Sequence, residues 1–135
     1  MHQPPLILTV DDQADFRDII KARLEAAGFR VETAVDGEVG IKKAKELKPD
    51  LVLMDVKMPG INGTEAVLDM QNDPDLKDIK VVFLSNLAAP WPGVSAPNEE
   101  FAKILGAHTF IDKSKELENV AEHVKKILGV DPKKS

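Results

Sequence analysis

Five polar residues that could carry out chemistry follow short apolar runs of this sequence. They are two neighbouring acids, a third acid, a hydroxyl and an ammonium: Asp11, Asp12, Asp55, Ser85 and Lys113. Three carboxylates repel one another when they lie close together, so such a cluster needs a bound cation or a proton. A ligand set made only of oxygen, with no histidine or cysteine in the pattern, favours Mg²⁺ over zinc. We therefore predict a magnesium site.

Asp55 is the best candidate for a nucleophile. A carboxylate can attack phosphorus and form an aspartyl-phosphate, provided that the charge on the transferred oxygens is neutralised. The metal ion and Lys113 would supply the positive charge, and the Ser85 hydroxyl would help to hold the phosphoryl group. Asp11 and Asp12 would then hold the metal.

The residues in front of these side chains have the pattern of buried β-strands. Nearly continuous apolar runs are typical of parallel strands covered by helices on both faces, and they occur at Leu6–Val10, Leu51–Met54 and Val81–Leu84. Val31–Ala34 and Thr109–Ile111 are weaker strand candidates. Because the carboxyl ends of parallel strands meet at one edge of a sheet, this arrangement would bring the polar residues together.

Helical patterns separate the strand candidates. Apolar residues recur at helical spacing in four stretches, the first of which ends before Gly28, a favourable stop. The four stretches are 16–27, 41–47, 66–70 and 117–128. Strands that alternate with helices predict right-handed βαβ units. The fold class is therefore α/β: a three-layer αβα sandwich around a doubly wound, five-stranded parallel sheet.

Length and composition fit one domain. We assign residues 1–135 to it, with a core from about 5 to 128 and a short polar tail at 129–135. The net charge of -5 argues against direct contact with nucleic acid. The absence of cysteine excludes disulfides and thiolate metal sites. Since neither a signal peptide nor a long apolar span is visible, we expect a cytoplasmic protein with no membrane insertion.

The segment 87–98, with the sequence LAAPWPGVSAPN, breaks the alternation of strands and helices. Its three prolines cannot all lie inside a helix, because each lacks an amide donor and clashes with the preceding turn. The next helix is therefore expected to start near Asn98, a favourable N-cap. Trp91 would either pack on the domain or anchor a partner. Gly60 and Gly63 are interpreted as turn residues.

The ordered set of motifs resembles the receiver domain of response regulators in two-component signal transduction. An acid pair comes first, then MDVKMPGING, then LSN and GAHTFIDKS. Each motif alone is weak, but the ordered set is specific, and the resemblance covers roughly Pro5 to Leu128. It implies a flavodoxin-like fold with strand order 2-1-3-4-5, in a stand-alone, single-domain protein.

Matched position by position, the resemblance implies a role for each residue of the metal and phosphate site. Asp55 corresponds to the phospho-acceptor. Asp12 corresponds to a direct Mg²⁺ ligand, and Asp11 to an acid that reaches the metal through water. The backbone carbonyl of Lys57 would complete the metal shell, and Lys113 corresponds to the phosphate-binding lysine.

Three more positions belong to the phosphoryl pocket and the switch. Ser85 corresponds to the hydroxyl that moves onto the phosphoryl group, and Phe110 to the aromatic residue that turns inward behind it. Asn86 stands where a small residue is usual, and its side chain would narrow access to the phosphoryl group. The spacing from Ser85 to Lys113 is longer than is typical because of the proline-rich segment.

The implied function is a switch activated by phosphorylation. Asp55 would accept a phosphoryl group from the phosphohistidine of a sensor histidine kinase or phosphotransfer protein. The phosphorylated domain, a monomer or a phosphorylation-dependent dimer, would regulate a protein partner. Self-catalysed phosphotransfer and slow autodephosphorylation would be its only enzymatic activities.

Other interpretations stay open. A phosphatase of the haloacid-dehalogenase type would also use an aspartate and magnesium, but it needs a second aspartate at the position of Lys57. A flavodoxin-like mononucleotide binder needs a phosphate loop where Asp11 and Asp12 stand. A degenerate receiver would bind partners without phosphorylation. The two acids could also be plain helix caps, and Lys113 a solvated surface lysine.

Overall fold

The computed structural model describes residues 2–56, 63–85, 107–113 and 117–133. Its five strands form one parallel sheet in the order β2-β1-β3-β4-β5. The strands are β1 (Leu6–Val10), β2 (Arg30–Ala34), β3 (Leu51–Asp55), β4 (Lys80–Ser85) and β5 (Thr109–Asp112). The predicted strand order is therefore confirmed, and each apolar run lies in a strand at most two residues longer than predicted.

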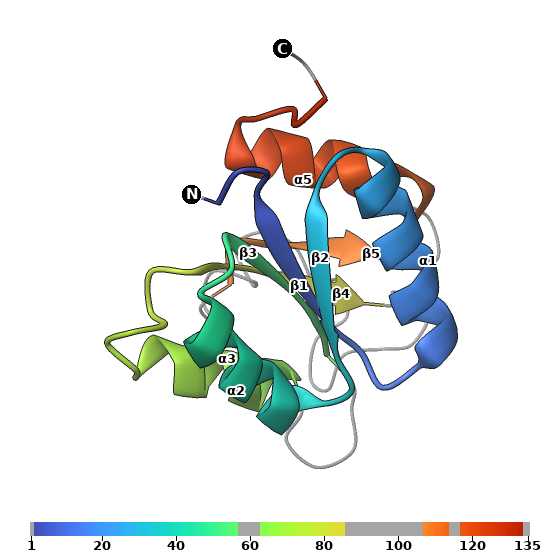
Figure 1. Cartoon of the computed structure of the whole chain (residues 1–135). Coiled ribbons are helices and arrows are strands. Elements are labelled where there is room, and N and C mark those ends of the chain that lie inside the picture. Colours follow the sequence, from blue (N-terminus) through green and yellow to red (C-terminus); the bar gives the residue numbers. More distant parts are fainter. Residues whose placement is uncertain (1, 57–62, 86–106, 114–116, 134–135) are drawn as a thin grey trace.

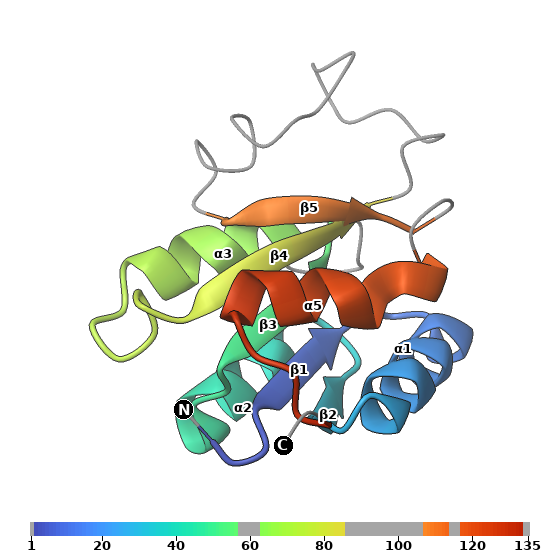
Figure 2. The same cartoon turned by 90° about the horizontal axis from the view of Figure 1, so that it is seen from above.

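Within the described residues, four α-helices and one 3₁₀ turn lie between and after the strands. They are α1 (Ala14–Ala26), α2 (Gly37–Leu47), α3 (Gly63–Gln71), the 3₁₀ turn η1 (Leu117–Asn119) and α5 (Val120–Leu128). Figures 1 and 2 show α1 and α5 on one face of the sheet and α2 and α3 on the other. The fold is thus the predicted three-layer sandwich.

Two apolar cores separate the layers. The central strands are buried on both faces, as their continuous apolar sequences predicted. Every residue of β1 and β3 is buried. One core packs the sheet against α1 and α5 through residues such as Ile20, Leu24 and Val124. The other packs it against α2 and α3 through Ala44, Val67 and Met70. The packing of helices on both faces of the sheet holds the strands, and therefore their ends, in place.

The ends of the helices agree with the sequence in part. α1 ends before Gly28, which has a φ of 97° that glycine adopts at low cost. The last helix is shorter than predicted, because Leu117–Asn119 forms a 3₁₀ turn before α5 begins. The helix expected near Asn98 and the segment 87–98 lie outside the described residues. None of the helices in the described part of the chain has the length and hydrophobicity that a bilayer crossing requires.

Candidate functional site

Three predicted site residues meet at the carboxyl edge of the sheet because each ends or directly follows a strand of the parallel sheet. Asp11 follows β1, Asp55 is the last residue of β3, and Lys113 follows β5. Side chains alternate between the two faces of a strand. Asp55 therefore shares a face with Leu53, and Lys113 with Ile111, and both apolar residues belong to the core under α1 and α5. The three polar side chains thus enter one space from the same face.

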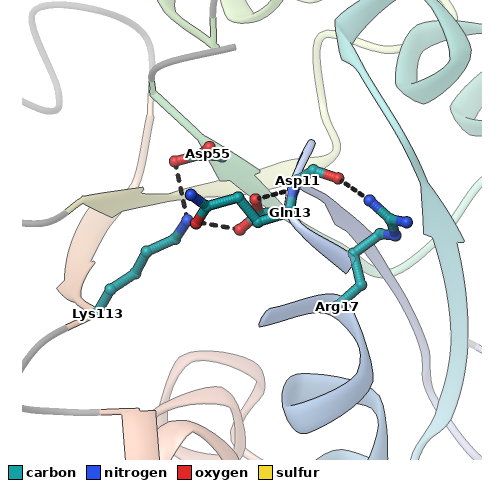
Figure 3. A network of polar contacts seen from close by, with 5 residues as sticks. All are labelled: Asp11, Gln13, Arg17, Asp55 and Lys113. Atoms are coloured by element: carbon teal, nitrogen blue, oxygen red, sulfur yellow. Dashed lines mark hydrogen bonds and ion pairs between the residues drawn. The ribbon is translucent and has the colours of Figure 1, made fainter. Parts of the chain in front are cut away.

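Lys113 connects the two acids (Figure 3). Its Nζ atom lies 2.5 Å from Asp11 Oδ2 and 3.2 Å from Asp55 Oδ1. The side chains of Lys113, Asp11 and Asp55 are 6%, 0% and 9% exposed. Because charges this well buried are costly unless they are paired, the contact belongs to the site and not to the solvated surface. The interpretation of Lys113 as a surface lysine is wrong.

Asp11 is held from three directions. Its Oδ1 atom accepts a hydrogen bond from the Gln13 backbone N–H at 2.9 Å, and the Arg17 guanidinium donates to the Asp11 carbonyl oxygen at 2.7 Å. Gln13 is the N-cap residue of α1 and makes no side-chain cap, and Asp12 is exposed. Neither acid therefore caps α1 in the ordinary way. The carboxylate of Asp11 instead orders the turn that joins β1 to α1.

An aromatic ring completes the surroundings of Lys113. Its Nζ atom lies 4.3 Å from the centroid of the Phe16 ring, which projects from the first turn of α1. This separation is within the range of a cation–π interaction. The sequence placed Phe16 on the apolar face of α1 but did not indicate this contact. Arg17 was likewise not foreseen as a site residue.

Burial changes the acidity of Asp55. Desolvation raises its pKa from 3.8 to about 6; the charge of Lys113 opposes this shift, and the charge of Asp11 adds to it. Burial has the largest effect because it disfavours the ionised carboxylate more than one ammonium can compensate. Asp55 is therefore ionised at neutral pH but close to the point at which it takes up a proton.

The acids have a geometry suited to one divalent ion. Carboxylate oxygens of Asp11, Asp12 and Asp55 all lie within 4.8 Å of one another. Oxygens bound to one octahedral Mg²⁺ ion are roughly 3 to 4.2 Å apart, so the acids would have to move closer by on the order of 1 Å to share it. Oδ2 of Asp11 is buried and, among the described residues, accepts no hydrogen bond of normal geometry despite its ion pair with Lys113. Three carboxylates and one ammonium leave about two negative charges, which the ion would neutralise.

The remaining predicted site residues are placed only in part. Ser85 is the last residue of β4 and pairs in register with Asp112, so its backbone lies at the same edge. Its side chain lies outside what the structure describes. Lys57 and Asn86 also lie outside the described residues.

Phe110 belongs to the other face of the sheet. It lies in β5, in register with Phe83 of β4. Its side chain is half-buried and packs against the core under α2 and α3. The aromatic residue is thus on the opposite side of the sheet from Lys113. The role of Phe110 as the switch aromatic stays a prediction.

Gly63 approaches Asp55 more closely than a turn would require. An added Cβ atom at Gly63 would lie 2.0 Å from the Asp55 carbonyl oxygen. The Gly63 N–H donates to the Val56 carbonyl at 2.9 Å. Glycine is needed here because the start of α3 touches the end of β3, and the turn geometry expected of Gly63 stays a prediction.

Comparisons with known proteins agree with this geometry. The response regulator receiver domain family matches residues 7–125. Chemotaxis protein CheY of Thermotoga maritima is 34% identical over 123 residues, which are 90% of this chain and 95% of that protein. The alkaline phosphatase synthesis transcriptional regulatory protein PhoP of Bacillus subtilis is 35% identical over 126 residues, and the match covers 90% of this chain. The chain spans 48% of PhoP, about half its length.

Solved structures show the same fold and extend the similarity. A putative response regulator from Chloroflexus aurantiacus superposes with a TM-score of 0.80 at 25% identity, covering 93% of this chain and 98% of that one. Chemotaxis response regulator CheY4 of Vibrio cholerae superposes with a TM-score of 0.77 at 26% identity, covering 91% and 98%. By sequence and by fold, this chain belongs to the response regulator receiver domain family.

Proposed function

We propose that this chain is a switch in which Asp55 accepts a phosphoryl group from a phosphohistidine on a histidine kinase or phosphotransfer protein. The observation that carries the proposal is the buried cluster of Asp11, Asp55 and Lys113 at the carboxyl edge of the sheet. Such a cluster costs stability, so its presence at this edge favours a functional role. An exposed Asp12 beside it offers an open side through which a donor can approach.

Two residues of the chain would supply the nucleophile and stabilise the negative charge on the transferred phosphoryl group. A carboxylate oxygen of Asp55 forms the new bond to phosphorus while the bond to the imidazole nitrogen of the donor breaks, and the imidazole leaves with the electron pair. Lys113, already 3.2 Å from Asp55 Oδ1, stabilises the negative charge on the transferred oxygens. Slow attack of water on the same phosphorus releases inorganic phosphate and returns Asp55 to its carboxylate form.

Magnesium is the proposed cofactor. Asp11, Asp12 and Asp55, with the backbone carbonyl of Lys57, would hold it, and the ion would neutralise charge on the phosphoryl oxygens. A carboxylate set without nitrogen or sulfur suits a hard cation of this kind. The Ser85 hydroxyl and Asn86 would contact the phosphoryl group. Movement of Ser85, followed by Phe110, would pass the change to a protein partner.

A small phosphodonor tests the proposal without knowledge of the kinase. Acetyl phosphate with Mg²⁺ should add one phosphoryl group to the wild type and none to Asp55→Asn, as measured by intact mass. Excess chelator should prevent the addition. Equal labelling of both proteins would refute Asp55 as the acceptor, and absence of labelling would favour a receiver that binds partners without phosphorylation. Steady turnover of p-nitrophenyl phosphate would favour the phosphatase alternative.

A further inference from the structure

The ammonium of Lys113 has a third neighbour besides its two acids. Its three N–H groups can point in three directions, and two of them are taken by Asp11 and Asp55. The Phe16 ring lies on a further side, with 4.3 Å from Nζ to the ring centroid. Since the Lys113 side chain is only 6% exposed, the ring stands where water would otherwise solvate the charge.

An aromatic ring is well suited to this place. A lysine carries its charge on a flexible four-carbon stem and usually extends it into water. A buried ammonium therefore needs contacts that hold it in place. A third carboxylate would bind the ammonium more tightly but would also draw it away from Asp55. The face of a ring attracts a cation through its quadrupole without becoming an alternative ion-pair partner. Leucine would cover the same space but would not attract the charge.

We propose that Phe16 is a positioning residue that holds the Lys113 ammonium in front of Asp55 during phosphoryl transfer. The inference rests on the proposed function of Asp55 as the acceptor. Phe16 does not touch the reacting atoms and acts through Lys113. Because Phe16 stands on α1 and Lys113 follows β5, the contact also ties the first helix to the edge strand.

The test compares Phe16→Leu with Phe16→Tyr, which keeps an aromatic face. The rate of phosphorylation by acetyl phosphate is measured over a range of donor concentrations, by intact mass, with Mg²⁺ present. We expect Phe16→Leu to lower the maximal rate about tenfold, with a smaller change in the half-saturating donor concentration, because stabilisation of the transferred charge is lost. Phe16→Tyr should stay within about twofold of the wild type. Equal maximal rates for wild type and Phe16→Leu would overturn the proposal.

Phe29→Leu is the control, because Phe29 is a buried aromatic residue of the core under α1 and α5 and, among the described residues, no cation lies over its ring. It should lower the melting temperature without lowering the maximal rate. If Phe29→Leu slowed phosphorylation as much as Phe16→Leu, the effect would be one of general packing, and the positioning role would be refuted.

A second measurement needs no phosphorylation and so separates this inference from the proposed function. The ring should shift the side-chain ε-protons of Lys113 upfield in the proton NMR spectrum, relative to the other lysines, and Phe16→Leu should abolish the shift. The Lys113 signals are assigned by their loss in Lys113→Met. Lys113 ε-protons at ordinary positions in the wild type would overturn the contact. If the shift is present but Asp55 takes no label, the proposed function fails and the contact stands as a structural one.

Discussion

Lys113 Nζ lies 2.5 Å from Asp11 Oδ2, and neither side chain is more than 6% exposed. The same ammonium reaches Asp55, so one cation compensates two buried acids. This makes Lys113 a structural residue as well as the proposed phosphate ligand. The stability of the metal-free protein should therefore depend on it.

Lys113→Met tests this dependence, since methionine keeps much of the side-chain length and removes the charge. Breaking a buried ion pair on one side typically costs about 3–5 kcal/mol, because the remaining charge stays buried. We expect a loss of this order in urea unfolding at neutral pH with chelator present, and a partial recovery when Mg²⁺ is added. Lys125→Met is the control: Lys125 pairs with Glu122 and Asp131 at the surface, and its removal should change stability little. Similar losses for both variants would contradict the structural role.

The raised pKa of Asp55 predicts how pH affects stability without metal. Burial raises this pKa from 3.8 to about 6, so the folded state binds the proton more tightly than the unfolded state. The resulting stabilisation is complete below about pH 3.8, falls as pH rises, and is gone above about pH 6. The shift corresponds to at most about 3 kcal/mol.

Mg²⁺ should therefore stabilise the protein more at pH 7.5 than at pH 5, because it binds the ionised carboxylate. The measurement is the increase in melting temperature with Mg²⁺ at the two pH values, with Ca²⁺-free buffer and excess chelator as the reference. Asp55→Asn should reduce this difference. An increase that is the same at both pH values would be inconsistent with a titrating Asp55 in the metal site.

The strands and the acid cluster could be predicted from the sequence because they depend on long-range regularities. Continuous apolar runs identify strands buried on both faces, and parallel topology brings Asp11, Asp55 and Lys113 to one edge whatever the details of the helices. The start of α5 could not be placed, because over one turn the apolar spacing of a 3₁₀ turn and an α-helix is nearly the same.

Contacts that depend on how one element packs against another could not be predicted from the sequence. The position of Phe16 over Lys113 follows from the packing of α1 on the sheet, and the reach of Arg17 to the Asp11 carbonyl follows from the same packing. Neither distance has a signature in residue spacing. The close approach of Gly63 to Asp55 is of the same kind, since sequence shows only that the residue is glycine.

Gly63→Ala should disturb both stability and the site. The added methyl would meet the backbone at the end of β3: the Asp55 carbonyl oxygen at 2.0 Å, its carbon at 2.9 Å and the Val56 Cα at 2.9 Å. Backbone cannot move aside as a side chain can, so we expect a loss of about 3 kcal/mol or more in urea unfolding. Phosphorylation of the folded fraction should also slow, because α3 or the end of β3 must shift.

Gly40→Ala provides the comparison for that variant. Its new methyl would lie 2.8 Å from Val10 Cγ2 and 3.1 Å from Val10 Cγ1, so it would meet the end of a side chain and not the backbone. The expected loss is smaller, about 1–2 kcal/mol, and the phosphorylation rate should not change. If Gly40→Ala proved the more damaging substitution, the contact between Gly63 and Asp55 would not be the reason for glycine at this position.

Asp11 and Asp12 are adjacent in sequence but differ in burial, and their variants should differ accordingly. Asp11 is fully buried, accepts from the Gln13 N–H and pairs with Lys113, whereas Asp12 is exposed. Asp11→Asn should weaken Mg²⁺ binding and also destabilise the metal-free fold, because the buried ammonium loses a charged partner. Asp12→Asn should weaken Mg²⁺ binding while metal-free stability stays the same or rises, because its charge repels that of Asp55.

Calorimetric titration with Mg²⁺ and urea unfolding with chelator, both at pH 7.5, separate the two effects. The informative result is the pattern across the pair: two weakened titrations but only one lowered unfolding free energy. Unchanged Mg²⁺ affinity in Asp12→Asn would remove the exposed acid from the proposed metal site. Unchanged metal-free stability in Asp11→Asn would mean that Lys113 does not need its partner at 2.5 Å, because Asp55 alone then suffices to hold the buried ammonium.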